Sequence, residues 1–232
     1  LREYSIQLIN SEDSIRKTIS NFKKIYPRLK IADICIGLGN FSTGGNISIN
    51  KRSNTIYIGL EYHGVDQNTN LSELDSSTID YVSRSNFYRT IIHELVHIQQ
   101  WTSVKKIVKS YSGDLLINRL LSEGIADFIA KLIVPHGNDG NYYKYGVQNE
   151  NLLKSQLFPM LYNSSYGFWF GGNDSLFHDK PRDLGYFMGS RIAKSYYEKN
   201  KKGLENLSEF IEIKDFKEFV SSSHYFDNLS NY

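Results

Sequence analysis

The chain has 232 residues, of which 40% are hydrophobic and 22% are charged, as is usual for a folded globular protein. Its formal net charge is only +2, so a strongly basic surface for nucleic acid is not expected. The single cysteine, Cys35, excludes an internal disulfide framework and a metal site built from several cysteines. Cys35 lies in an apolar run, so we expect a buried, inert thiol.

No run of residues approaches the roughly 20 apolar side chains that a transmembrane helix requires, so no transmembrane segment is expected. The sequence starts at Leu1 without a signal peptide, and the missing initiator methionine suggests a trimmed or mature form. Secretion is therefore left open. The sequence also leaves the oligomeric state open.

The first third of the chain predicts a helix followed by strands. Residues 11–26 begin with Ser11 and carry apolar side chains at helical spacing, which predicts an amphipathic helix. Residues 31–64 contain short β-branched and aromatic runs separated by glycine, asparagine and serine, which predicts three or four strands joined by hairpins. Residues 65–84 are polar and are expected to form a loop.

The rest of the chain is expected to be mainly helical. Long helices are predicted at about 86–109, 115–134 and 182–199, with a break at residues 113–114. The segments expected to be loops are 136–146 and 162–174, and a shorter helix is expected at 151–161. Strands that come first, with helices after them and no βαβ alternation, indicate an α+β fold. We expect one domain over 1–232, with a helix-plus-sheet subdomain at 1–84, whose sheet is mostly antiparallel, and a helical subdomain at 85–232.

The segment IIHELVHIQQ, residues 91–100, carries the strongest chemical signal. Each residue of an α-helix is rotated by about 100° from the one before, so His93 and His97 lie one turn apart on one face and can bind one metal ion. Glu94 borders that face, where a base can take a proton from water without being a ligand. The alternative is a surface helix with two incidental histidines. The strongly apolar flanks disfavour it, because polar groups in such a helix need partners.

A catalytic zinc usually has three protein ligands and one open position, so a further ligand is needed. The metzincin pattern is excluded, because it requires glycine and histidine where this chain has Gln100 and Ser103. The apolar segment LLSEGIADFIA offers Glu123, with Asp127 one turn later on the same face. We expect Glu123 to bind the metal and Asp127 to accept a hydrogen bond from a ligand histidine, His93. The alternative is a helix start or a salt-bridge pair.

The two motifs, His93-Glu94-x-x-His97 and Glu123-x-x-x-Asp127, resemble those of the gluzincin class of zinc metallopeptidases, the thermolysin-like arrangement. The resemblance implies a zincin-like fold, with Glu123 as third ligand and Asp127 as its partner residue.

The segments IYIGLE, HELVHIQQ, SEGIADFIA and DLGYFMGSRIAKSYYEK together are similar to a bacterial family of predicted zinc-dependent proteases, which is related to a gliding-motility lipoprotein family of Bacteroidetes. This similarity covers about residues 31–220. Relatives of that family are often exported or lipid-anchored, which implies the cell envelope or secretion, while a cytoplasmic location stays open.

A peptidase of this type needs a donor that stabilises the oxyanion of the tetrahedral intermediate. Tyr186, at the start of the helix predicted at 182–199, is the first candidate and His178 is the second; Arg182 and Arg191 are further ones. The alternatives are a packing tyrosine and a loop histidine. The small residues of that helix, among them Gly189, are expected to let it pack closely on the Glu123 helix and bring Tyr186 to the site.

Two further features are candidates for substrate binding. Gly44, Gly45 and Asn46 lie in a predicted strand that could pair with an extended substrate, as the gluzincin resemblance implies. The aromatic segments 141–146 and 166–172 could line a substrate cleft, although clustered aromatic side chains are more often part of a core.

The expected function is hydrolysis of peptide bonds with a Zn²⁺ ion held by His93, His97 and Glu123, and the expected partner is a peptide or protein substrate. The metal would polarise the carbonyl, and Glu94 would act as general base on the metal-activated water and later protonate the leaving amine. Two alternatives are a non-catalytic, zinc-stabilised binding or envelope-accessory protein and a zinc hydrolase of a non-peptide amide. A purely structural site has no need of an uncoordinated base, so Glu94 favours the enzyme.

Overall fold

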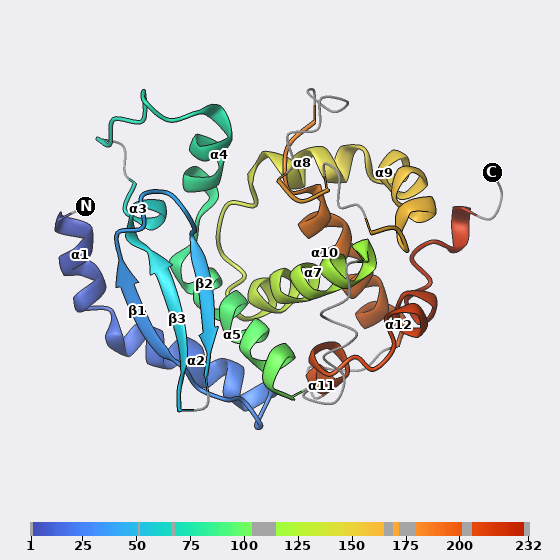
Figure 1. The fold of residues 1–232 in the computed structure, drawn as a ribbon, viewed down its shortest axis with the longest axis horizontal. Helices are drawn as coiled ribbons and strands as arrows, with labels where there is room; N and C mark the ends of the chain where they lie inside the picture. The colour runs from blue at the N-terminus through green and yellow to red at the C-terminus, as the bar shows by residue number, and fades with distance from the viewer. Residues whose placement is uncertain are drawn as a thin grey trace. The chain divides into compact units, whose positions relative to one another are not determined.

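The computed structural model describes residues 2–50, 52–65, 68–103, 115–164, 169–171, 180–200 and 206–229. A small sheet follows N-terminal helices and precedes a long helical part, so the predicted α+β class is confirmed (Figure 1). The chain divides into two compact units, Leu1–Gln99 with Ile129–Gly140 and Gln100–Phe128 with Asn141–Tyr232. The first unit contains the expected helix-and-sheet subdomain 1–84 together with most of the motif helix.

The sheet has three strands in the order β1-β3-β2, namely β1 (Asp33–Gly37), β2 (Gly45–Ile49) and β3 (Asn54–Gly59). β2 and β3 form an antiparallel hairpin, in which Ile47 lies opposite Ile56. The chain reverses direction twice between β1 and β3, so these two strands run the same way and pair in parallel. The sheet is therefore mixed, and β2 lies at one edge.

The helix predicted at 11–26 is confirmed as α2 (Glu12–Ile25), which follows the short helix α1 (Arg2–Ile9). Phe22 of α2 and Ile56 of β3 are both fully buried in the core of this unit. Cys35 is exposed, so the expectation of a buried thiol is wrong. The reason is that β1 is an edge strand whose alternate residues, Cys35 among them, are exposed to solvent.

Two helices occupy segments that the sequence did not predict as helical. α3 (Leu60–His63) follows β3 directly, and α4 (Ser76–Arg84) lies in the segment 65–84 that was predicted to be a loop. The Asp75 carboxylate accepts the backbone N–H groups of Ser77 at 2.9 Å and Thr78 at 3.1 Å, which caps α4. The loop prediction was wrong because capping residues are the same polar types that occur in loops.

The long helices predicted from periodicity are confirmed as α5 (Phe87–Ser103), α7 (Leu116–Ile133) and α10 (Leu184–Lys199). The expected end of the first near Lys109, and the break at 113–114, lie outside the described residues. The remaining helices are α8 (Gly140–Gln148), α9 (Glu150–Leu157), η1 (Phe158–Met160), α11 (Leu207–Ile211), α12 (Phe216–Ser223) and η5 (Asp227–Leu229). Because α8 occupies the second half of segment 136–146, the loop predicted there was wrong in that half.

α7 and α10 pack against each other through their backbones, as the small residues of α10 predicted. A Cβ atom added to Gly124 would lie 2.1 Å from the carbonyl carbon of Gly189. A Cβ atom added to Gly189 would lie 1.9 Å from the carbonyl oxygen of Leu120. Any side chain at either glycine would therefore force the two helices apart.

In the part of the chain that the structure describes, no helix combines the length and the apolar character that crossing a bilayer requires.

Candidate metal centre

The two histidines of the motif lie on one face of α5, as their spacing predicted. Their Nε2 atoms are 3.0 Å apart. The two rings are nearly perpendicular, at 86°, with centroids 4.6 Å apart. His97 is buried and His93 is half-buried. One metal ion could therefore contact both nitrogens.

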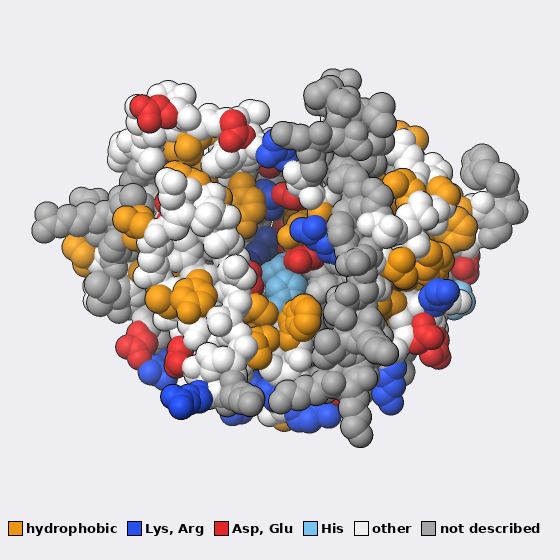
Figure 2. Space-filling view, viewed as in Figure 1, with side chains coloured by type: hydrophobic (Ala, Val, Ile, Leu, Met, Phe, Trp, Pro, Cys, Tyr) orange, Lys and Arg blue, Asp and Glu red, His pale blue; other side chains and the backbone are white. Residues whose placement is uncertain are grey.

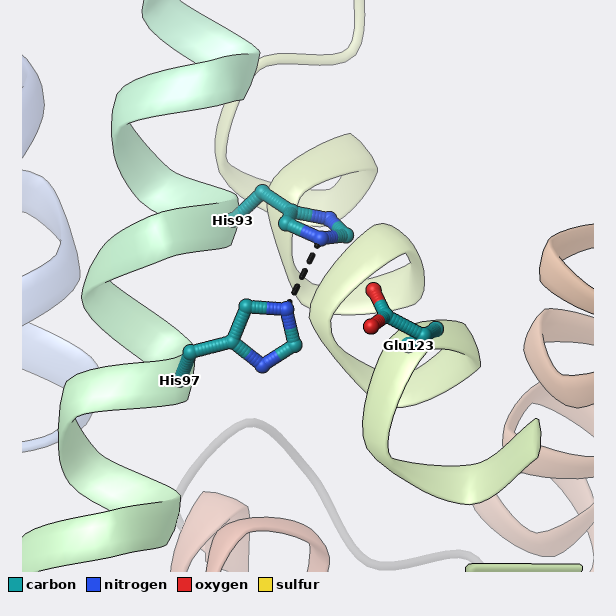
Figure 3. A group of neighbouring side chains, drawn as sticks. All are labelled: His93, His97 and Glu123. Atoms are coloured by element: carbon teal, nitrogen blue, oxygen red, sulfur yellow. Dashed lines mark hydrogen bonds between the residues drawn. The ribbon is translucent and has the colours of Figure 1, made fainter. Parts of the chain in front are cut away.

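His93, His97 and Glu123 form a group in which each residue offers one ligand atom and all these atoms lie within 4.8 Å of one another (Figure 3). The Glu123 carboxylate extends from α7 toward the two imidazoles. Zinc bonds of 2.0–2.1 Å at a tetrahedral angle place two nitrogens about 3.3 Å apart, so little movement of the histidines is needed. Histidine side chains also reach the surface in the centre of the face drawn in Figure 2.

The chemistry of this donor set fits a divalent transition metal. Two imidazoles and one carboxylate are the protein ligands of one class of catalytic zinc site, and imidazole also suits iron, nickel and copper. The sequence predicted all three of these residues as ligands, and the structure brings the three together.

Glu94 stands outside this group of three donors and is itself buried, with 7% of its surface exposed. Its carboxylate lies against the start of β2, because a Cβ atom added to Gly45 would be 2.6 Å from Glu94 Oε1. The same added atom would be 2.7 Å from Thr90 Cγ2. The strand therefore contacts α5 at the residue expected to be the base, and a side chain at Gly45 would displace the Glu94 or Thr90 side chain.

The three residues predicted to bind substrate lie together at this point. Gly44 immediately precedes β2, and Gly45 and Asn46 are its first two residues. A Cβ atom added to Gly44 would be 2.6 Å from the Tyr81 hydroxyl oxygen. β2 is an edge strand of the sheet. The predicted residues lie at the start of this strand, next to Glu94.

The other predicted residues of the site have different outcomes. Asp127 accepts a long hydrogen bond of 3.4 Å from the Tyr142 hydroxyl, and its predicted bond with His93 stays a prediction. The Tyr186 ring packs edge-on against Phe170 at 5.5 Å, and its role as oxyanion donor also stays a prediction. His178 lies outside the described residues, as do 166–168 and 172 of the expected cleft wall.

Arg191, a further candidate for the oxyanion, is already engaged. Its Nε donates to Glu150 Oε1 at 2.9 Å, and the Tyr225 hydroxyl donates to the same oxygen at 2.7 Å. This network accounts for the arginine without a role in catalysis. The segment 141–146, proposed as cleft wall, forms most of α8, where Tyr142 is buried.

Two buried glutamines at the end of the motif were not predicted to have a role. Gln99 exchanges two hydrogen bonds with the backbone of Lys30, at 2.8 and 2.9 Å. Gln100 donates to the carbonyl oxygen of Ser122 at 3.1 Å and accepts from the Ser122 hydroxyl at 3.2 Å. Ser122 directly precedes Glu123, so Gln100 links α5 to α7 next to a predicted ligand. The only sequence signal for this link is the presence of two amides, three residues or fewer after His97, in an otherwise apolar helix.

Comparisons of the chain with protein-family models, with curated proteins and with solved structures found no match.

Proposed function

We propose that this protein is a zinc-dependent peptidase of the gluzincin type. One observation carries the proposal: His93, His97 and Glu123 come together within 4.8 Å, while the buried carboxylate that directly follows the first histidine is left out of the group. A purely structural metal site has no use for a buried carboxylate in that position, and a hydrolytic site requires a base there.

The metal-binding residues and Glu94 have separate roles in the proposed hydrolysis. A zinc ion held by the three donors would supply a Lewis acid that polarises the scissile carbonyl and acidifies water. Glu94 takes the proton from the attacking water and later gives it to the leaving amine. Because Glu94 lies on the same helix as the two histidines, one turn of α5 fixes the distance between base and ligands.

The start of β2 supports an extended peptide as the substrate. An edge strand offers unpaired N–H and C=O groups to which such a peptide can add as a further strand. β2 is an edge strand, and its first residue lies against Glu94. A peptide that pairs with β2 would thus pass the base with its backbone in a defined orientation, which a small non-peptide amide would not exploit.

The proposal is tested by metal analysis and by cleavage of an unbiased peptide library, with wild type and the variant Glu94→Gln side by side. We expect one zinc per chain in both proteins, cleavage by wild type, and a loss of about 10²–10⁴-fold in kcat for Glu94→Gln. Glu12→Gln, which makes the same change at an exposed residue of α2, should cleave normally.

Full activity in Glu94→Gln would refute the assignment of the base. A zinc-loaded wild type that cleaves no peptide in the library would refute the peptidase.

A further inference from the structure

Glu61, in α3, is a buried carboxylate that the proposed chemistry does not use. It is 6% exposed. Its oxygens accept the backbone N–H groups of Gly39, at 3.0 Å, and of Phe41, at 2.8 Å. A carboxylate is costly to bury unless it is hydrogen-bonded, and here the bonds go to the segment that leads into β2. Glu61 therefore shapes the backbone that precedes the edge strand.

The backbone of this segment needs such support. Asn40 and Phe41 have φ angles of 53° and 54°, a left-handed conformation that side chains other than glycine rarely adopt. Phe41 is 37% exposed, so burial of its ring does little to compensate for the strain. Backbone N–H groups that converge in such a turn form a concavity for an anion, and the Glu61 carboxylate fills it. The strained conformation and the carboxylate thus belong together.

The next two residues of α3 hold the same segment. The Tyr62 hydroxyl donates to the carbonyl oxygen of Phe41, and the two rings pack edge-on at 5.4 Å. His63 places Nε2 3.4 Å from the carbonyl oxygen of Gly44 and Nδ1 2.7 Å from the Ser85 hydroxyl. The segment is therefore attached to α3 at its beginning, middle and end.

The attached segment ends at the proposed base. Gly45 follows directly, and an added Cβ atom there would lie 2.6 Å from Glu94 Oε1. A shift of the segment would move the start of β2 relative to Glu94. Strained backbone that is held in place by hydrogen bonds is typical of functional sites. Here the strained segment leads to Gly45, which lies against the proposed base Glu94.

We propose that Glu61 is a positioning residue of the peptidase: it fixes residues 39–44 so that β2 presents its edge to the substrate beside Glu94. The inference rests on the proposed function. Glu61 acts through the backbone and touches neither the metal ligands' donor atoms nor the substrate. It prepares a binding edge that substrate and transition state use alike, so its loss should raise KM and leave kcat nearly unchanged.

The test is Glu61→Gln, which keeps the size of the side chain but replaces one acceptor oxygen with an NH₂ group. We expect unchanged zinc content, a rise in KM of about 10-fold or more, and kcat within about 3-fold of wild type, because charge-assisted hydrogen bonds are lost. Hydrogen exchange at the Gly39 and Phe41 amides should become faster. Glu73→Gln, the same substitution at an exposed residue of this unit, should change none of these values.

A modified substrate separates positioning from general loosening. Backbone N-methylation, scanned along a good peptide substrate, should raise KM for wild type at the position that pairs with β2, and should raise it much less for Glu61→Gln. Equal rises in both enzymes would overturn the inference, and so would an unchanged KM or a loss confined to kcat.

If Glu61→Gln does not fold, Tyr62→Phe removes one bond to the same segment and should raise KM by a smaller factor; an unchanged KM there would also overturn the inference. A wild type that cleaves no peptide refutes the proposed function. An active wild type whose KM is not changed by Glu61→Gln refutes only the role of Glu61.

Discussion

At the scale of single residues, the contact between His93 and His97 has a geometry that suits the proposed shared metal as well as a hydrogen bond. Their Nε2 atoms are 3.0 Å apart. In a pair of neutral imidazoles, one nitrogen donates the shared proton and the other accepts it. A metal ion between the rings would take a lone pair from each Nε2, so the donating ring would carry its proton on Nδ1 instead, and the pair would need only a slight widening. The rings are thus already arranged for coordination.

Replacing His97 with alanine should therefore abolish high-affinity zinc binding. The loss of one of three ligands removes the chelate, and we expect the affinity to fall by more than about 100-fold, above the range for residues that only support a ligand. His224→Ala is the matched control, because His224 is exposed and its Nδ1 contacts Asp227 Oδ2 at 2.8 Å, away from the proposed ligands. Zinc retained by His97→Ala, measured by mass spectrometry after dialysis, would contradict the assignment.

His63 should make the stability of the protein depend on pH. Burial lowers its pKa from 6.5 to about 4, against the opposing effects of the Gly44 carbonyl and Glu61. Above pH 6.5 the ring is neutral whether the chain is folded or not. Between pH 6.5 and 4 the unfolded chain binds the proton and the folded one does not, so stability falls as the pH falls, and the effect levels off below pH 4.

Urea unfolding at pH 7 and pH 4.5 measures this contribution. The stability lost by wild type over that range should exceed the loss in His63→Gln by roughly 2 kcal/mol, from 1.36 kcal/mol per pH unit of altered affinity. His136→Gln removes an exposed histidine from the same unit and should behave like wild type. An identical pH dependence in His63→Gln and wild type would show that His63 is not the group responsible.

At the scale of elements, the end of α5 is held by two consecutive, fully buried glutamines. Gln99 bonds with the backbone at Lys30, between α2 and β1, and Gln100 bonds with Ser122 of α7. Both side chains therefore contribute to stability, but the hydrogen bonds of Gln100 go to the helix that carries Glu123, whereas those of Gln99 go to Lys30 and Leu95. The pair offers a matched comparison of two buried amides.

Gln100→Leu and Gln99→Leu should both lower the melting temperature, because each leaves buried backbone groups without their partner. Only Gln100→Leu should weaken zinc binding, by about 10-fold or more, since residues that orient metal ligands have effects of that size. Competition with a zinc-binding dye gives both affinities. Equal affinities in the two variants would mean that the Gln100–Ser122 link does not set the position of Glu123.

The crossing of α7 and α10 should not accept a methyl group. Alanine is the better helix former by about 1 kcal/mol, so Gly189→Ala would be stabilising if only propensity counted. The added Cβ atom would instead lie 1.9 Å from the Leu120 carbonyl oxygen. We expect destabilisation of about 3 kcal/mol, at the upper end of overpacking effects. Gly37→Ala is the control, because nothing lies within 4 Å of a Cβ atom there; similar losses in both variants would contradict the steric explanation.

Features that depend on residues close together in the sequence could be predicted, and features that depend on distant residues could not. α5, α7 and α10 were predictable because their apolar side chains repeat at helical spacing, and the grouping of His93, His97 and Glu123 followed from the same geometry. α3 and α4 were not, because four- and nine-residue helices depend on caps and tertiary contacts. The bonds of Gln99 and Gln100 join residues 69 and 22 positions apart, and no local pattern reports such a partner.

At the scale of the whole molecule, the metal group joins parts of the chain that are distant in sequence. His93 and His97 come from α5 and Glu123 comes from α7, and residues 104–114 between these helices lie outside the described ranges. A metal that binds only when the two helices are in place stabilises the folded state against all others. Metal binding at the proposed site would therefore be coupled to folding, and thermal unfolding would report on it without any substrate.

Removing the metal should lower the melting temperature by an amount that grows with the logarithm of the zinc affinity. Free zinc at 1,000 times its dissociation constant stabilises a protein by about 4 kcal/mol. In a chain of more than 200 residues each kcal/mol corresponds to about 2–4 °C, so a chelator should lower the melting temperature by roughly 8–16 °C. Glu94→Gln keeps all three ligands and should show the same shift as wild type, whereas His97→Ala should show almost none. This pattern separates metal binding from catalysis. A chelator effect of equal size in His97→Ala and wild type would place the bound metal elsewhere in the molecule, and a missing shift in Glu94→Gln alone would make Glu94 a ligand and remove it as the base.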